Sequence, residues 1–212
     1  PRDAGATLVG PIRVTVDASD PDRWVHFDFS RGSVVAAPAA REWDLAFRRF
    51  NVMVNGGPGF DGEGAAIDLG EVAFEAVKAA PDTGWVVGAA PRDSGHPALA
   101  RWYDYGFTSH LLTPKPVVWA VRTADGRYVK MEILGYYCPG ARAGCLTFRY
   151  VYQGDGSRTV RPASESATAL HASTSRAVDA ESRSILASIR VRSASAASSR
   201  SRASSRRRTT RW

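Results

Sequence analysis

Val117-Val-Trp-Ala-Val-Arg-Thr-Ala-Asp-Gly-Arg-Tyr-Val-Lys-Met-Glu-Ile-Leu-Gly-Tyr-Tyr137, continued by Cys138-Pro-Gly-Ala-Arg-Ala-Gly-Cys145 and Leu146-Thr-Phe-Arg-Tyr-Val-Tyr152, is the stretch that decides the fold. Its Asp125-Gly126 pair separates two runs rich in β-branched and aromatic residues. This is a strong hairpin signal, and it favours a type I′ turn, in which both central residues have positive φ. We therefore expect three consecutive antiparallel strands.

The second of these runs alternates between apolar and polar side chains. Val129, Met131 and Ile133 fall on one face of the expected strand, whereas Lys130 and Glu132 fall on the other. A period of two is typical of a strand with one buried face. The meander therefore needs a second layer that covers its apolar side.

The rest of the chain supplies further strands. The candidates are Ile12–Val16, Trp24–Phe29, Ser33–Val35 and the long segment Trp43–Val54, whose apolar face switches near Arg48-Arg49 and so indicates a bulge or bend. Residues 72–78 fit a short helix or an edge strand equally well. The fold class expected is all-β, with a single antiparallel domain over residues 10–157.

Residues 85–116 are interrupted by four prolines and look loop-rich. Aromatic side chains gather within them, at Trp102, Tyr103, Tyr105 and Phe107. Loops with many aromatic residues are more often binding surfaces than plain connections. We therefore expect a binding surface in this region.

Positive charge is concentrated at the C-terminal end. Residues 158–212 hold twelve Arg, no Lys and three acidic residues, whereas residues 1–157 have a net charge of −2. Nucleic-acid binding through the body of the chain is therefore not expected. The Arg/Ser/Ala-rich tail cannot form a core, so we expect it to be disordered. It is an arm for an anionic partner, a solvated tail, or the product of a non-native reading frame.

Two cysteines, Cys138 and Cys145, flank the loop between the second and third expected strands. They can form a disulfide across the neck of a hairpin or remain reduced at the strand ends. A disulfide would favour an exported protein. No stretch reaches the roughly 20 apolar residues of a membrane span. The chain also lacks the common hydrolase, metalloprotease and dinucleotide motifs, so we do not expect an enzyme.

Two stretches resemble the HmuY family, exported haem-binding proteins of Gram-negative bacteria. One is Trp43-Asp-Leu-Ala-Phe-Arg-Arg-Phe-Asn-Val-Met-Val-Asn-Gly-Gly57. The other runs from Trp102-Tyr-Asp-Tyr105 through His110-Leu-Leu-Thr-Pro-Lys115 and residues 121–137 to Leu146-Thr-Phe-Arg-Tyr150. The resemblance covers most of residues 24–152 and implies an all-β haem carrier at the cell envelope. Such a carrier is outer-membrane-anchored or secreted and works with an outer-membrane receptor, although the sequence shows neither a signal peptide nor an anchor.

Haem iron takes His, Met, Cys or Tyr as an axial ligand. The axial candidates here are His110, which would be the metal ligand of first choice, His96, Met53 and Met131. The residues expected to line the haem pocket are Trp102, Tyr103, Tyr105, Phe107, Tyr136 and Tyr137. Arg48, Arg49 and Arg142 are candidates for pairing with the haem propionates.

The function expected is therefore non-catalytic haem capture and delivery for iron acquisition. Haem would sit in an apolar slot with one or two axial side chains. The alternative is an envelope β-domain that keeps the fold for an interaction or structural role and does not bind haem.

Overall fold

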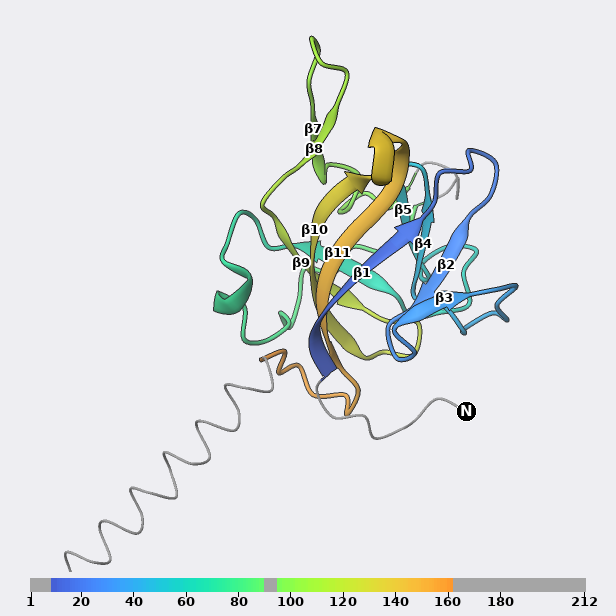
Figure 1. Cartoon of the computed structure of the whole chain (residues 1–212). Coiled ribbons are helices and arrows are strands. Elements are labelled where there is room, and N and C mark those ends of the chain that lie inside the picture. Colours follow the sequence, from blue (N-terminus) through green and yellow to red (C-terminus); the bar gives the residue numbers. More distant parts are fainter. Residues whose placement is uncertain (1–8, 90–94, 162–212) are drawn as a thin grey trace, which may run out of the picture. The chain divides into compact units, whose positions relative to one another are not determined.

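The computed structural model describes residues 9–89 and 95–161. Within them the regular secondary structure is antiparallel β-sheet with only short 3-10 turns beside it, as expected from the sequence (Figure 1). The described residues contain no helix that is both long and apolar enough to cross a membrane. We predicted disorder for the Arg-rich segment 158–212; of this segment, residues 162–212 lie outside the described residues, and residues 158–161 are described.

The meander forms the centre of a five-stranded sheet with the order β1-β11-β10-β9-β6. Its strands are β1 (Val9–Asp17), β6 (Ala65–Asp68), β9 (Val118–Arg122), β10 (Tyr128–Tyr137) and β11 (Ala143–Gln153). The three expected strands are present and pair in sequence order. Strand β6 was not predicted, because its four residues adjoin a glycine-rich segment that reads as a loop.

The predicted type I′ turn is wrong. Gly126 has a φ of +80°, but Asp125 does not have a positive φ. The N–H of Gly126 donates to the carbonyl of Thr123 at 3.0 Å, and the N–H of Thr123 donates to the carbonyl of Arg127 at 2.9 Å, which closes a three-residue loop. The Thr123 hydroxyl stabilises this loop by donating to Asp125 and accepting from the Arg127 N–H.

A four-stranded sheet with the order β3-β2-β4-β5 forms the second layer. Its strands are β2 (Val25–Asp28), β3 (Ser33–Val35), β4 (Leu45–Arg48) and β5 (Asn51–Val54). The expected bend near Arg48-Arg49 is instead a complete reversal, since Arg48 pairs with Asn51. Arg49 takes the left-handed conformation, with a φ of +54°, which allows this tight turn.

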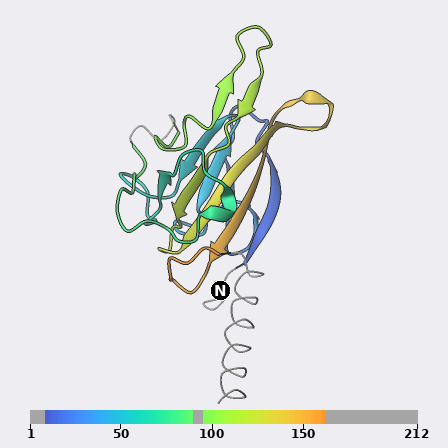
Figure 2. The same cartoon turned by 90° about the vertical axis from the view of Figure 1, so that its left-hand side faces the viewer.

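The two sheets face each other (Figure 2), and aromatic side chains from both pack into one shared hydrophobic core. Phe27 and Phe47 of the four-stranded sheet meet Phe148 of β11, with ring centroids 5.3 and 5.5 Å away from it. All three rings are fully buried. The alternation of the meander therefore places its apolar face on this shared core.

A third, two-stranded sheet consists of β7 (Tyr103–Tyr105) and β8 (Leu112–Pro114). The sequence predicted loops here because Pro114 and Pro116 interrupt regular structure. The two strands are only three residues long and pair over their whole length, with Pro114 opposite Tyr103. In Figures 1 and 2 this hairpin projects from the two main sheets beside the turn between β10 and β11, whereas the start of β1 and the segment that follows β11 lie at the other end of the domain.

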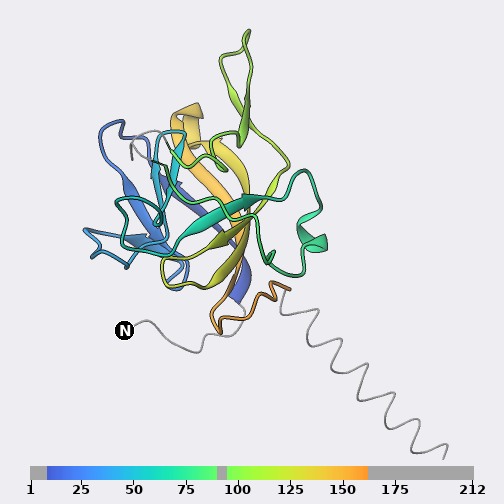
Figure 3. The same ribbon diagram turned by 180° about the vertical axis from the view of Figure 1, so that it is seen from behind.

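The sequence did not decide between a helix and a strand for residues 72–78. They contain the 3-10 turn η1 (Phe74–Ala76), which lies beside the five-stranded sheet (Figure 3). The buried Lys130 holds it, donating to the carbonyls of Phe74 at 2.9 Å and Val77 at 2.8 Å. Val160 is also fully buried and packs on Phe74, so the packed region continues to the last described residues.

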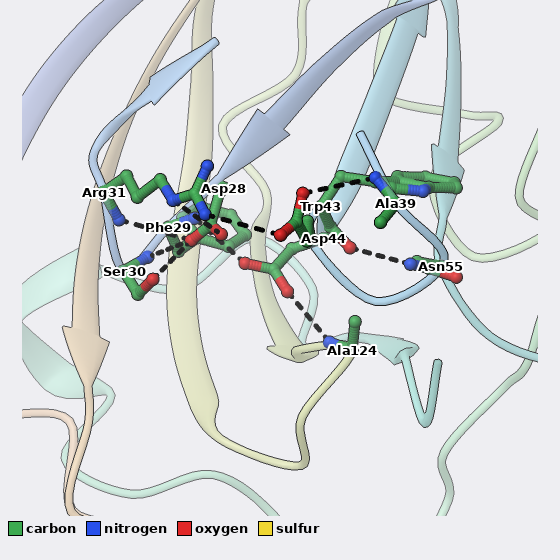
Figure 4. A network of polar contacts seen from close by, with 10 residues as sticks. Asp28, Phe29, Ser30, Arg31, Ala39, Trp43, Asp44, Asn55 and Ala124 are labelled. Carbon is green, nitrogen blue, oxygen red and sulfur yellow. Dashed lines mark hydrogen bonds and ion pairs between the residues drawn. The ribbon is translucent and has the colours of Figure 1, made fainter. Parts of the chain in front are cut away.

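A buried carboxylate connects the two layers (Figure 4). Asp44 accepts hydrogen bonds from the Phe29 N–H at 2.9 Å and from the Ala124 N–H at 2.8 Å. The first donor follows β2, and the second lies in the turn between β9 and β10. Burial raises the pKa of Asp44 to about 7, with a further contribution from the nearby carboxylate of Asp28, although both backbone bonds act to lower it.

Candidate functional site

The β7–β8 hairpin ends in a closed loop over residues 106–111. The N–H of Gly106 donates to the carbonyl of Leu111 at 2.9 Å, and the N–H of His110 donates to the carbonyl of Gly106 at 2.7 Å. His110 takes the left-handed conformation with a φ of +56°. Non-glycine residues in this conformation often occur at functional sites, where the surrounding structure compensates for the strain.

The side chain of His110 is oriented by Tyr105. The Tyr105 hydroxyl lies 2.5 Å from Nδ1 of His110, and the two rings are 5.9 Å apart. Within the described residues, Nε2 of the same imidazole has no hydrogen-bond partner. An exposed histidine whose Nδ1 is held by a neighbour, while Nε2 makes no hydrogen bond, is the usual arrangement of a metal-binding histidine.

Exposed apolar groups surround this imidazole. Phe107 at the tip is 85% exposed, and Tyr105 and Leu111 are 44% and 49% exposed. Solvent-facing apolar side chains gathered on one short hairpin indicate a surface that binds something.

The base of the hairpin is fixed to the core. Trp102 is fully buried and donates from Nε1 to the carbonyl of Phe50 at 2.8 Å. Tyr136, 3% exposed, packs against Trp102, and Tyr103 packs on the indole at 4.9 Å. Tyr137 accepts a hydrogen bond at its hydroxyl from the Leu112 N–H at 2.8 Å, which ties β8 to β10. Trp102 and Tyr136 therefore support the hairpin from beneath and do not line its surface.

The other predicted axial ligands lie elsewhere. His96 is buried, and both ring nitrogens are used: Nε2 lies 3.0 Å from the carbonyl of Val86, and Nδ1 accepts from the Ala98 N–H. Burial lowers the pKa of His96 to about 4. Met131 is fully buried in the main core. Met53 packs with Trp43 on the outer side of the four-stranded sheet. The structure therefore does not bring these three side chains to His110.

The turn beside the hairpin is closed by a disulfide between Cys138 and Cys145, whose Cα atoms are 4.9 Å apart. Arg142 in this loop donates to Asp17 at 2.9 Å and to the Ser19 hydroxyl at 2.6 Å. Hydrogen bonds from Ser19 and Arg142 lower the pKa of Asp17 to about 2.

The predicted propionate partners are engaged in other contacts. Arg142 is held by the Asp17 pair, and Arg49 donates to the carbonyls of Ser19 and Ala143. Arg48 stacks over the Trp24 ring at 4.5 Å. At the hairpin base itself the cation is Lys115, which pairs with Asp104 at 3.3 Å.

Residues 20–150 match the family described as HmuY protein. The chain belongs to the HmuY family. No curated protein was found to match it. The family match runs from the start of the four-stranded sheet to the middle of β11, so it includes the projecting hairpin and the disulfide loop.

Solved HmuY-like structures share the fold. The apo HmuY analogue of Tannerella forsythia is 18% identical, with a TM-score of 0.53, and the match covers 69% of this chain and 96% of that one. A Bacteroides vulgatus protein described provisionally as HmuY-like and haem-binding is 20% identical, with a TM-score of 0.52, covering 65% and 89%. A Bacteroides fragilis protein described provisionally as a lipoprotein is 19% identical, with a TM-score of 0.51, covering 65% and 88%. Identities this low show a common fold only.

Sequence reasoning missed several members of the site. Leu111 lies in the loop before β8, and nothing in its spacing indicates that it is solvent-exposed. The contact between Tyr105 and His110 had a weak signal, since residues that flank a short turn face each other across it. Lys115 ends the His110–Lys115 stretch that resembles the family, but the sequence predicted no role for it.

Proposed function

We propose that this protein is a non-catalytic haem-binding protein of the cell envelope and that the β7–β8 hairpin holds the haem. Membership of the HmuY family supports haem as the ligand. The Bacteroides vulgatus relative, described provisionally as haem-binding, supports it further. The observation that carries the proposal is His110, an outward-facing imidazole on an aromatic hairpin.

The residues of the hairpin fit the chemistry of haem. A porphyrin needs a flat apolar surface, and Phe107, Tyr105 and Leu111 expose such groups beside His110. The iron needs a nitrogen donor, and Nε2 of His110 has no competing partner in the described part of the chain. The Tyr105 hydroxyl on Nδ1 would fix the ring orientation of that ligand. When bound, the haem supplies an iron centre that accepts axial ligands.

One axial side chain is the arrangement we propose. The other candidates for an axial ligand are not available at the hairpin. His96 is buried and bonded to the Val86 carbonyl, Met131 is buried, and Met53 packs with Trp43 elsewhere. Tyr137 lies close to the hairpin, but its hydroxyl already accepts the Leu112 N–H. A single imidazole leaves one axial position of the iron open to a small molecule or to a receptor.

Capture and delivery of haem would suit an exposed, single-ligand site, because release then requires the loss of one bond to iron. We propose an envelope location, anchored or secreted, in line with the lipoprotein description of the Bacteroides fragilis relative. An outer-membrane receptor as the recipient of the haem, and iron acquisition as the purpose, are part of the same proposal.

The proposal is tested by titrating the full chain with hemin and following visible absorption, beside the His110→Ala and Tyr105→Phe variants. We expect a saturable one-to-one shift of the Soret band with a high-spin spectrum. His110→Ala should weaken binding by about 10–100-fold, and Tyr105→Phe, which removes only the hydroxyl, by a smaller factor.

The His26→Ala variant, which removes an imidazole elsewhere, serves as the matched control and should bind hemin normally. A shift that is unchanged in His110→Ala would keep haem binding but remove this hairpin as the site. The absence of any saturable shift would refute haem binding and favour the alternative, an envelope β-domain with an interaction or structural role.

A further inference from the structure

A second cavity lies on the outer face of the four-stranded sheet, and its volume is about 340 Å³. None of its lining residues belongs to the β7–β8 hairpin. Its lining is Trp24, His26, Ala40, Trp43, Met53, Asn55, Gly59, Phe60 and Asp61. The size is at the lower end of small-molecule sites.

Its walls are aromatic and meet as a corner. The rings of Trp43 and Phe60 are 5.9 Å apart with an interplanar angle of 71°. His26 meets Trp43 at 4.8 Å and 72°. Rings set nearly at right angles form a corner in which a compact, rounded group can contact several ring faces at once. We call Trp24, Trp43 and Phe60 the aromatic corner.

The charge of the lining favours a cation. Asp61 is the charged residue in the lining; it is exposed, and no described residue pairs with it. His26 also has no hydrogen-bond partner among the described residues, and burial lowers the pKa of His26, so it stays uncharged near neutral pH. Arg48 stacks over the Trp24 ring at 4.5 Å, so one face of this indole is already covered by a guanidinium.

The corner is held in place before any ligand arrives. Asn55 is buried, and its Nδ2 donates to the carbonyl of Ala40 at 2.9 Å and to that of Trp43 at 2.8 Å. Figure 4 shows the bond to Trp43. Its Oδ1 accepts from the Gly62 N–H at 3.3 Å. One side chain therefore fixes the segments that carry Trp43 and Phe60, which reduces the entropy lost on binding.

We propose that the aromatic corner, with Asp61 at its rim, is a binding site for a small alkylammonium cation of the trimethylammonium class. The ring faces attract the positive charge, and the methyl groups bury apolar surface against the indoles. The carboxylate adds an ionic contact that a neutral ligand of the same shape cannot use.

The test is isothermal titration of the full chain with choline chloride at constant ionic strength. The matched probe is 3,3-dimethylbutan-1-ol, which has the shape of choline without the charge. We expect saturable one-to-one binding of choline and binding of the alcohol at least about tenfold weaker. Phe60→Leu and Asp61→Asn should each weaken choline binding by about three- to tenfold.

Glu71→Gln, which neutralises an exposed carboxylate outside the cavity, should leave the choline affinity unchanged. His110→Ala should also leave it unchanged, so that failure of the haem proposal and failure of this one are distinguishable. Equal affinity for choline and the neutral alcohol would overturn the proposal. So would the absence of any binding heat, or choline binding that neither Phe60→Leu nor Asp61→Asn alters.

Discussion

Two buried groups make opposite contributions to the pH dependence of folding. Asp44 has a pKa of about 7 in the folded protein against an ordinary value of 3.8. Between these values the folded state holds a proton that the unfolded state has released, so stability falls as the pH rises. His96 has a folded pKa of about 4 against 6.5. In that window the unfolded state holds the extra proton, so stability rises with pH.

The contributions of Asp44 and His96 to the free energy of unfolding nearly cancel. One pKa unit corresponds to about 1.4 kcal/mol, so Asp44 would cost up to about 4 kcal/mol at pH 8 and His96 up to about 3 kcal/mol at pH 4. Because the two windows overlap, we expect the free energy of unfolding of the wild type to change little between pH 4.5 and 6.5. His26, whose pKa is lowered by burial, adds a slope of the same sign as that of His96.

Single substitutions should reveal each contribution. In Asp44→Asn the free energy of unfolding should rise with pH across this window, and in His96→Gln it should fall. Both variants will also lose stability at every pH, because each alters a buried hydrogen-bonded group, so the comparison is between slopes. The assay is denaturant unfolding followed by tryptophan fluorescence at several pH values. If both variants kept the slope of the wild type, the linkage would be wrong.

Three further predictions concern separate features. Lys130→Met leaves two buried carbonyls at the η1 turn without their donor and should lower the free energy of unfolding by about 2–4 kcal/mol in denaturant titrations, whereas Lys130→Arg should lose less. Replacing Cys138 and Cys145 together by serine should cost about 2.5 kcal/mol, and alkylation before and after reduction, read by mass, checks that the thiols are paired. Phe107→Ala should leave stability unchanged, since the ring is 85% exposed, yet weaken hemin binding in the absorption titration. A large loss of stability would show that Phe107 is part of the core.

The strands that the sequence predicted well are those in which apolar alternation and burial agree. Val129, Met131 and Ile133 face the core as their spacing indicates. The turns were predicted less well, because side-chain bonds decide them. The Thr123–Asp125 bond favours a three-residue loop, and the left-handed Arg49 reverses a segment that reads as one long strand.

The candidate site was predictable in part for a related reason. His110 and Tyr105 stand out by residue type, but their contact depends on a short hairpin. The sequence did not predict this hairpin, because Pro114 lies in its second strand. Burial could not be assigned from the sequence. Trp102 and Phe107 lie in the same aromatic stretch of the sequence, yet Trp102 is fully buried and Phe107 is 85% exposed. Only the tertiary contact of Trp102 with the Phe50 carbonyl separates them.

The positions of the first and last described segments of the domain have a practical consequence. The start of β1 and the segment that follows β11 lie at the end of the domain away from the β7–β8 hairpin (Figures 1 and 2). A domain joined to a support through either of these positions would therefore present the hairpin outward. A tag or surface linker attached there should leave hemin access undisturbed. A carrier tethered at that end would likewise direct the β7–β8 hairpin away from its tether and toward a partner.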